Sequence, residues 1–190
     1  GLAPERCGGS EERDNGNGSL MRILPIALHF AGLPPRELCR LAHRASSLTH
    51  AHPRSLMACG IYCLIAARVL EGAPPREAYR RGIKDAHAVY QAPPFGDELP
   101  HFARVFSGGI DELPEDSVQS GGYVIHTLEA ALWCWLRAEG YDDAVLRAIN
   151  LGGDTDTTAC VTGGLAGLTH GLAAIPAAWR AALARQADIL

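Results

Sequence analysis

The chain has 190 residues, a net charge of −4 and 47% hydrophobic residues, with 17 lysines and arginines against 21 acidic residues. This length is sufficient for one buried core, and the charge balance is ordinary for a globular protein. No basic cluster stands out and no uncharged apolar run reaches about 18 residues, so we expect neither a nucleic-acid nor a membrane partner. We expect a single domain over residues 1–190, with a flexible segment at 1–15.

Helices are the predicted elements, because apolar residues recur at helical spacing and strand-like alternation is nearly absent. In chain order they cover residues 20–31, 35–45, 54–71, 75–91, 123–138, 142–149, 155–172 and 177–190. The best short strand candidate, residues 123–125, runs directly into a helix. Residues 91–122 are rich in proline and glycine and predict a long connection with one short helix near 98–106, a length more often functional than accidental. The sequence therefore predicts an all-α fold.

Cysteine usage predicts a cytoplasmic protein. Six cysteines are scattered without a Cys-x-x-Cys pair, and the polar residues 1–17 lack the apolar stretch of a secretory signal. Four cysteines fall in apolar helical segments, where a free thiol behaves as a small core hydrophobe: Cys59, Cys63, Cys134 and Cys160. We therefore expect reduced thiols.

The segment 155–172 is apolar or small nearly all round, with Ala159, Gly163 and Gly167 four residues apart. Such a composition predicts a helix that is buried on every side. Glycine inside a helix costs ~1 kcal/mol relative to alanine, so these glycines imply close packing that compensates. We expect this helix to be the central one.

The run before that helix, residues 150–158, reads Asn-Leu-Gly-Gly-Asp-Thr-Asp-Thr-Thr. Asp154, Asp156 and Thr157 offer hard oxygen ligands of the kind that Mg²⁺, Mn²⁺ or Ca²⁺ prefer. The alternative is simple helix capping, with acidic residues at the positive end of the helix dipole. A cap needs only one side chain, however, and here three clustered oxygen ligands follow a glycine pair that lets backbone approach a ligand. Their place at the mouth of the central helix favours a metal site.

A glycine-rich turn at residues 14–22, Asp-Asn-Gly-Asn-Gly-Ser-Leu-Met-Arg, brings Ser19 to the start of a helix. Backbone N–H groups in such a turn, together with a helix N-terminus, suit phosphate oxygens. A plain loop with a serine cap is the alternative. Arg22 is equally suited to a phosphate contact and to a structural ion pair.

Two further segments carry candidate ligand-binding side chains. In Leu-Thr-His-Ala-His-Pro, residues 48–53, one histidine facing a ligand is more credible than a zinc site, which needs further Cys or His ligands. In Ser-Gly-Gly-Tyr, residues 120–123, the glycines permit close backbone approach and Tyr123 offers a stacking face. A loop followed by a core aromatic residue is the alternative there.

These segments, in this order, resemble the ADP-ribosylglycohydrolase family, which includes the dinitrogenase reductase-activating glycohydrolases. The resemblance covers about residues 14–182, and its most specific part is Asn-Leu-Gly-Gly-Asp-Thr-Asp-Thr, followed by the Gly/Ala-rich helix, Ile175-Pro176 and Trp179. It implies a compact multi-helix globule of that family's type without the family's N-terminal helices. It also implies hydrolysis of the bond between C1″ of ADP-ribose and a modified side chain, so the partner is an ADP-ribosylated protein or a small ADP-ribose derivative.

The resemblance also assigns roles to residues of this chain. Asp154, Asp156 and Thr157 would be ligands of a site that in the complete family fold holds two Mg²⁺ ions, or Mn²⁺ in their place, and the two aspartates would be catalytic. The residues implied to bind substrate are Asn17, Gly18, Ser19, His50, Tyr123, Gly152 and Gly153.

One expected part of the family pattern is not found. The family's N-terminal region carries an acidic motif that supplies the remaining metal ligands and an acid/base carboxylate, and no such motif precedes residue 16. We expect either the C-terminal part of a longer or nicked enzyme, with an N-terminal fragment of the same enzyme as partner, or a truncated form with reduced function. The alternatives are a non-catalytic module that binds ADP-ribose or a related nucleotide, and a structural relative such as the family's lens crystallins.

Overall fold

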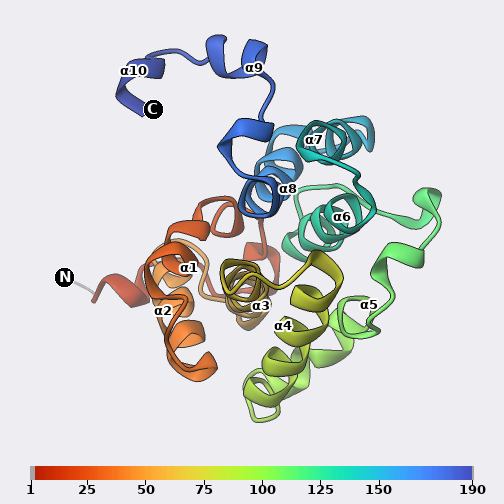
Figure 1. The fold of residues 1–190 in the computed structure, drawn as a ribbon. Helices are drawn as coiled ribbons and strands as arrows, with labels where there is room; N and C mark the ends of the chain where they lie inside the picture. The colour runs from red at the N-terminus through yellow and green to blue at the C-terminus, as the bar shows by residue number, and fades with distance from the viewer. Residues whose placement is uncertain (1–2, 190) are drawn as a thin grey trace.

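The computed structural model describes residues 3–189, and over that range the chain folds into helices without a single β-strand (Figure 1). The predicted all-α class is therefore confirmed. The α-helices of this range are α1 Leu24–Phe30, α2 Pro35–Ser47, α3 Pro53–Leu70, α4 Pro75–Val89, α5 Ala103–Phe106, α6 Val124–Arg137, α7 Tyr141–Asn150, α8 Thr155–His170, α9 Ala177–Ala181 and α10 Gln186–Ile189. The 3₁₀ helices are η1 Pro4–Arg6, η2 Glu12–Asp14, η3 Leu20–Arg22, η4 Gly96–Phe102, η5 Ile110–Glu112, η6 Glu115–Ser117 and η7 Leu172–Ala174.

Prolines set several of the helix boundaries. Helices α2 and α4 begin at Pro35 and Pro75, the second proline of the two Pro-Pro-Arg-Glu sequences. Proline suits this position because its missing N–H would have no partner in the first turn. The single helix predicted at 20–31 is instead η3 followed by α1, since Pro25 lies in the first turn of α1.

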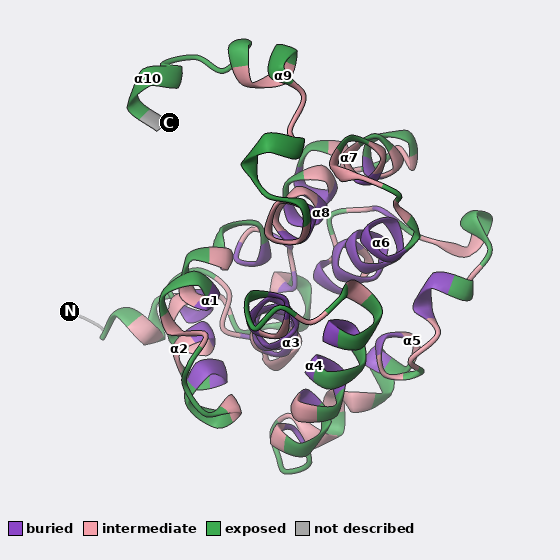
Figure 2. Cartoon of the chain, in the orientation of Figure 1, coloured by how far each residue is buried: buried purple, intermediate pink, exposed green. Residues whose placement is uncertain are grey.

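Two further predicted helices, near residues 98–106 and at 177–190, compare differently with the structure. The short helix predicted near residues 98–106 is confirmed as η4 followed by α5. The continuous helix predicted at 177–190 is wrong, because α9 and α10 are separate and Arg185 between them has a φ of 57°, outside the helical region. Figures 1 and 2 show this C-terminal stretch leaving the helical body, with mostly exposed residues.

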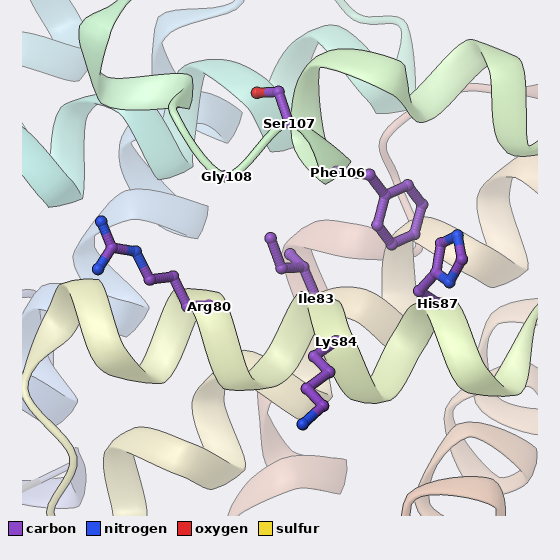
Figure 3. A pocket seen from close by; sticks show the side chains of 7 residues that line it. All are labelled: Arg80, Ile83, Lys84, His87, Phe106, Ser107 and Gly108. Atoms are coloured by element: carbon purple, nitrogen blue, oxygen red, sulfur yellow. The ribbon is translucent and has the colours of Figure 1, made fainter.

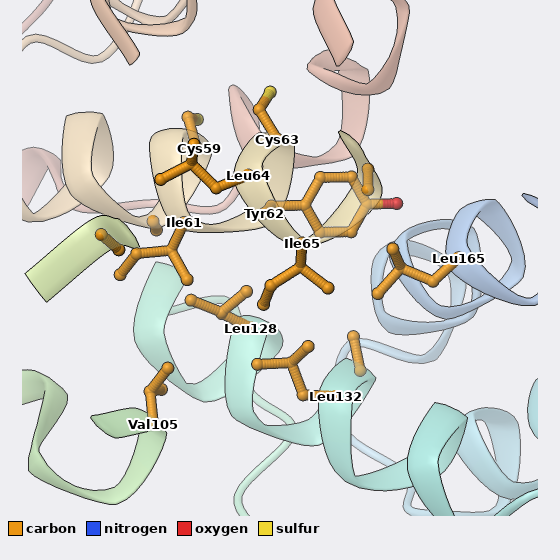
Figure 4. Packing of buried hydrophobic residues seen from close by; sticks show 14 of the residues in the cluster. Cys59, Ile61, Tyr62, Cys63, Leu64, Ile65, Val105, Leu128, Leu132 and Leu165 are labelled. Carbon is orange, nitrogen blue, oxygen red and sulfur yellow. The ribbon is translucent and has the colours of Figure 1, made fainter. Parts of the chain in front are cut away.

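Helix α3 lies at the centre of the fold, where it packs against α1, α2, α4, α6 and α8. Its core face includes Ile61 and Ile65, which lie toward Leu128 and Leu132 of α6 and Leu165 of α8 (Figure 4). All five side chains are exposed by 1% or less, so truncation of any one to alanine is expected to cost about 2–5 kcal/mol. The helices that carry the candidate site residues are therefore fixed to one common core.

Length and composition alone would allow α3 to cross a membrane. It is the one such helix in the range that the structure describes, with 18 residues, a mean hydropathy of 1.3 and 72% of them buried inside the fold. The sequence expectation of no such helix rested on the absence of an uncharged apolar run of about 18 residues, and Arg54 and Arg68 interrupt the run here. A buried core helix has the same composition, and burial among its neighbours accounts for α3.

Helix α8, predicted to be central and buried on every side, is only partly buried, so that prediction is wrong. Cys160, expected in the core, is exposed, although all six cysteines are free as expected. Small residues make α8 apolar, but they also leave room for large aromatic side chains of α3 and α7. A Cβ added to Gly164 would lie 2.5 Å from Tyr62 Oη, and one added to Gly163 would lie 3.4 Å from Tyr141 Oη. The glycines therefore permit close packing without requiring a central position.

The segment that was expected to be flexible, residues 1–15, makes specific backbone contacts where the structure describes it. The Gly9 N–H donates to Thr49 O at 3.2 Å, and the Ala51 N–H donates to Gly9 O at 2.7 Å. These bonds form an isolated parallel bridge between Gly9 and His50. The segment is thereby fixed beside the 48–53 loop, close to the candidate site.

Candidate active site

The side chain of Asn17 joins the glycine-rich turn to the start of α8. Its amide donates one hydrogen bond to Asp154 Oδ2, at 2.6 Å, and another to Thr127 Oγ1 of α6, at 2.8 Å. Asn17 and Thr127 are buried, whereas Asp154 is half-buried. Asn17 is 110 positions from Thr127 and 137 from Asp154. The structure therefore brings together the motifs that the resemblance assigns to substrate and to metal.

The Ser-Gly-Gly-Tyr segment completes this cluster through its backbone. The Asn17 N–H donates to Gly122 O at 3.1 Å, and the Asp154 N–H donates to Ser120 O at 2.8 Å. A Cβ added to Gly122 would lie 3.5 Å from Asp154 Oδ2, so this backbone passes directly beside the carboxylate. Three of the four sequence motifs thus meet at the N-terminal end of α8.

The glycine pair before Asp154 has a conformational reason to be glycine. Gly152 and Gly153 have φ values of 76° and 67°, in the left-handed region that favours glycine. A Cβ added to Gly153 would lie 2.6 Å from Ser120 O, so the close approach expected for a ligand is, at this residue, an approach to the protein's own backbone. Open space surrounds the Cβ position of Gly152. Substrate contact by either glycine stays a prediction.

Asp154 is held in its charged form. Its pKa lies below the ordinary 3.8, chiefly because Asn17 donates to it; partial burial opposes this effect, and smaller contributions come from Asp156 and Thr157. Asp154 stands at the N-cap position of α8, but its side chain accepts no capping hydrogen bond within normal distance. Asp156 is exposed and Thr157 is buried. Two carboxylates and a hydroxyl therefore lie at one helix end, one carboxylate already fixed by an amide.

The oxygen atoms of Asp154, Asp156 and Thr157 are the type of ligand that a hard divalent cation prefers. They are too few to hold two such ions. Mg²⁺ is commonly held by one or two carboxylates, with waters or substrate oxygens completing about six positions. Throughout residues 3–189, no three or more His, Cys, Asp and Glu side chains gather where they could hold a metal. Asp154, Asp156 and Thr157 would supply at most part of the shell of one ion, and metal binding by them stays a prediction.

His50 lies against the glycine-rich turn. A Cβ added to Gly18 would lie 3.0 Å from His50 Cε1, and one added to Gly16 would lie 3.4 Å from His50 Nε2. Thr49 Oγ1 contacts His50 Nδ1 at 2.7 Å and accepts a bond from Arg22 at 2.5 Å. Burial, and then the nearby Arg22 charge, lower the pKa of His50. The turn therefore rests on a neutral imidazole, and Gly18 leaves room for it.

Two polar side chains of these motifs have structural roles. Ser19, predicted to bind substrate, is fully buried, and its hydroxyl accepts bonds from Ser46 Oγ at 2.9 Å and Cys59 Sγ at 3.4 Å. Its side chain therefore faces α2 and α3 rather than a ligand, which corrects the prediction for that hydroxyl. His52 Nδ1 accepts the Arg54 N–H at 3.2 Å and caps α3.

Tyr123 lies at the edge of a small cavity next to this cluster. It forms an antiparallel bridge with Gly16, and its half-buried ring lies edge-on to His126, with 4.9 Å between the ring centroids. Arg54 holds Glu12 at the rim of the cavity through a 2.9 Å ion pair. The cavity has a volume of about 330 Å³ and is lined by Glu12, Arg13, Asn15, Gly16, Gly122 and Tyr123. Since Gly122 also borders Asp154, the cavity and the Asp154 carboxylate share one wall.

The sequence did not point to Thr127, Asn15 or Ser55. Ser55 Oγ donates to Asn15 Oδ1 at 3.0 Å, and this buried bond ties the turn to α3. Thr127 and Ser55 are hydroxyl residues on largely apolar helices. A hydroxyl residue among apolar neighbours is the only feature of the sequence that marks these positions, because their hydrogen-bond partners are distant in the chain.

Comparison with known proteins agrees with this geometry. The sequence model of the ADP-ribosylglycohydrolase family matches residues 1–190. A solved structure titled "ADP-ribosylglycohydrolase-related protein complex" superposes with a TM-score of 0.78 at 34% identity, covering 95% of this chain and 59% of that one.

Three curated relatives carry hydrolase names. The ADP-ribosylarginine hydrolase Tri1 of Serratia proteamaculans is 29% identical over 185 residues, which are 96% of this chain and 46% of that protein. The ADP-ribosyl-[dinitrogen reductase] glycohydrolase of Rhodospirillum rubrum is 32% identical over 88% of this chain and 50% of its own length. The human ADP-ribosylhydrolase ARH3 is 26% identical over 93% and 56%, respectively. The chain therefore spans about half the length of the relatives that it matches.

The order of the motifs, the all-α architecture and the family match along the whole chain all indicate the same family. Asn17, Tyr123 and Asp154 lie in three motifs that are distant in sequence and adjacent in space. This chain belongs to the ADP-ribosylglycohydrolase family.

Proposed function

We propose that this chain takes part in hydrolysis of the glycosidic bond between ADP-ribose and a protein side chain, or a related small derivative, and so reverses ADP-ribosylation. Supporting observations are the hydrolase names of the relatives and the convergence of the family motifs. The single observation that carries the proposal is the Asn17 amide, which fixes an ionised Asp154 at the entrance to α8.

We propose further that Asp154, Asp156 and Thr157 hold Mg²⁺, with Mn²⁺ as a substitute. Their oxygens match the preference of such ions, and the Asn17 bond engages Asp154 Oδ2 and not Oδ1. A bound ion would orient ribose hydroxyls and a water molecule and act as a Lewis acid. A second ion would need ligands beyond these three. We propose that an N-terminal segment of the same enzyme, outside these 190 residues, supplies them.

The chain's own residues would stabilise the charge that develops on the ribose and position the substrate. Hydrolysis breaks the bond from C1″ to the side-chain nitrogen or oxygen, forms a bond from C1″ to a water oxygen, and returns a proton to the leaving side chain. Positive charge develops on the ribose in an oxocarbenium-like state. Asp154 and Asp156 would stabilise that charge, Asn17 keeps Asp154 ionised, and Gly18, His50 and Tyr123 would shape the sugar and diphosphate contacts.

One observation favours a second candidate, binding of ADP-ribose without turnover. Only two carboxylates gather at the start of α8, and none of the described residues adds a third. Hydrolysis needs an acid/base group in addition to charge stabilisation. A module with this site but no further carboxylate would bind the nucleotide-sugar and release it unchanged.

Peptides that carry ADP-ribosyl-arginine or ADP-ribosyl-serine, incubated with MgCl₂ and the chain, alone and joined to the N-terminal segment, test the proposal. Released ADP-ribose is expected from the joined form, and Asp154→Asn with Asp156→Asn should abolish it. Asp142→Asn, an exposed carboxylate in the first turn of α7, is the matched control and should not. Calorimetric binding of ADP-ribose without turnover would support the second candidate. Absence of both would refute the proposal for this site.

A further inference from the structure

A second hollow lies between α4 and the loop that follows α5, and no candidate active-site residue lines it (Figure 3). Its volume is about 540 Å³, larger than the 330 Å³ cavity beside Tyr123. We call it the α4 groove. Its lining residues are Arg80, Ile83, Lys84, His87, Phe106, Ser107 and Gly108.

The α4 groove is lined by basic side chains and by no acidic one. Arg80 and His87 are seven positions apart, so they fall on one face of α4, and Lys84 borders the groove between them. All three are exposed. In Figure 3, Arg80 extends toward the 107–108 loop, whereas Lys84 leaves the opposite side of the helix. Lys84 is also the only lysine of the chain. An otherwise acidic protein thus presents a local cationic surface here.

Neighbouring cations are neutralised, and those of the groove are not. Arg76 of α4 forms an ion pair with Asp111, and Arg81 forms one with Glu71 at 2.6 Å. Among the described residues, neither Arg80 nor Lys84 has an acidic partner within ion-pair distance. Arg80 and Lys84, which border the same groove, are therefore available to an anionic group from outside.

The rest of the groove is apolar. Ile83 is 8% exposed and lies between Arg80 and the aromatic end, where the His87 and Phe106 rings meet edge to face with 5.7 Å between centroids. Gly108 has a φ of 79°, and nothing lies within 4 Å of its Cβ position, so the loop leaves the groove open. The groove therefore has a cationic end, an aliphatic floor and an aromatic end.

We propose that the α4 groove docks a short acidic segment of a partner protein. Arg80 and His87 are seven residues apart on α4, about 10 Å along its axis, which corresponds to about three residues of extended chain. Such a segment places an aromatic or aliphatic side chain against Phe106 and His87, one carboxylate beside Arg80 and a further carboxylate at the edge of the groove that Lys84 borders. A small anion would use only the cationic end and leave the apolar surface uncovered. Docking here does not depend on hydrolysis, so the two proposals fail separately.

Fluorescence anisotropy with a labelled peptide of one phenylalanine followed by three glutamates tests the docking. The double substitution R80E/K84E should weaken binding about tenfold, because it replaces two attractions with repulsions. Raising the salt from about 50 mM to about 500 mM should also weaken it. The matched control is R6E/R36E, an equal charge change at two exposed arginines, which should leave binding within about twofold.

Lysine protection gives a second readout that needs no substitution. Acetylation of Lys84 in the unmodified chain, followed by mass spectrometry, should slow when the peptide is bound, while acetylation of the N-terminal amine should not. Equal weakening by both double variants, or unchanged Lys84 acetylation, would overturn the proposal. So would displacement of the peptide by inorganic phosphate or ADP at similar concentrations, which would indicate a small-anion site instead.

Discussion

Substitution of Asn17 by alanine removes the two side-chain hydrogen bonds that join the turn to α6 and α8. The bond to buried Thr127 is neutral and is expected to contribute about 1 kcal/mol, while a bond to a charged group contributes about 1.5–3 kcal/mol. Asp154 is only half-buried, so solvent screening places its bond at the lower end of that range. The free energy of unfolding should therefore fall by about 2–3 kcal/mol at neutral pH.

The pH dependence of this cost separates the two bonds. The pKa of Asp154 is lower in the folded chain than its ordinary 3.8, so the stability from its charged form is present above that value and is lost as pH falls through the lowered pKa. Urea unfolding followed by circular dichroism should show the cost of Asn17→Ala shrinking toward about 1 kcal/mol as pH falls through the lowered pKa of Asp154. Asn150→Ala, an exposed asparagine, should change stability by less than about 0.5 kcal/mol. A cost that does not change with pH, or no cost at all, would refute the reasoning.

Three further substitutions test other parts of the fold. Gly60→Ala would place a methyl group onto buried Tyr90 Oη and should cost about 2–3 kcal/mol, whereas Gly32→Ala, with nothing within 4 Å, should be nearly neutral in thermal unfolding. Burial lowers the pKa of His43 from 6.5 to about 4, so the wild type should lose about 2–3 kcal/mol as pH falls across that interval, and His43→Gln should flatten the loss. Burial raises the pKa of Glu129, so Glu129→Gln should gain stability relative to the wild type as pH rises above 4.5; a constant difference would contradict this.

Local chemistry made much of the fold predictable. Proline and a following glutamate mark the starts of α2 and α4, and the Gly-Gly-Asp-Thr sequence marks the start of α8. These patterns mark helix starts because they depend on backbone hydrogen bonding within a single turn, and the local sequence determines that bonding. The all-α class followed from them, because so few segments alternate like strands.

Tertiary relations could not be predicted in the same way. The sequence composition predicted that α8 is the central helix, but α3 occupies that position. Small residues are apolar whether they are buried or exposed, so composition does not show how far α8 is buried. Ser19 was predicted to face a ligand, yet Ser46 and Cys59 bind its hydroxyl in the core. The bond from Asn17 to Thr127 joins residues 110 positions apart, and no local pattern records such a pairing.

Calorimetric titration of MgCl₂ into the 190-residue chain tests the central claim most directly. The wild type should bind one ion, and Asp154→Asn with Asp156→Asn should weaken that binding by more than about tenfold, since carboxylates supply most of the attraction. Asp142→Asn should bind as the wild type does, because its carboxylate lies at the start of α7 and not α8. Equal binding by all three proteins, or none by the wild type, would contradict a metal site at the entrance to α8.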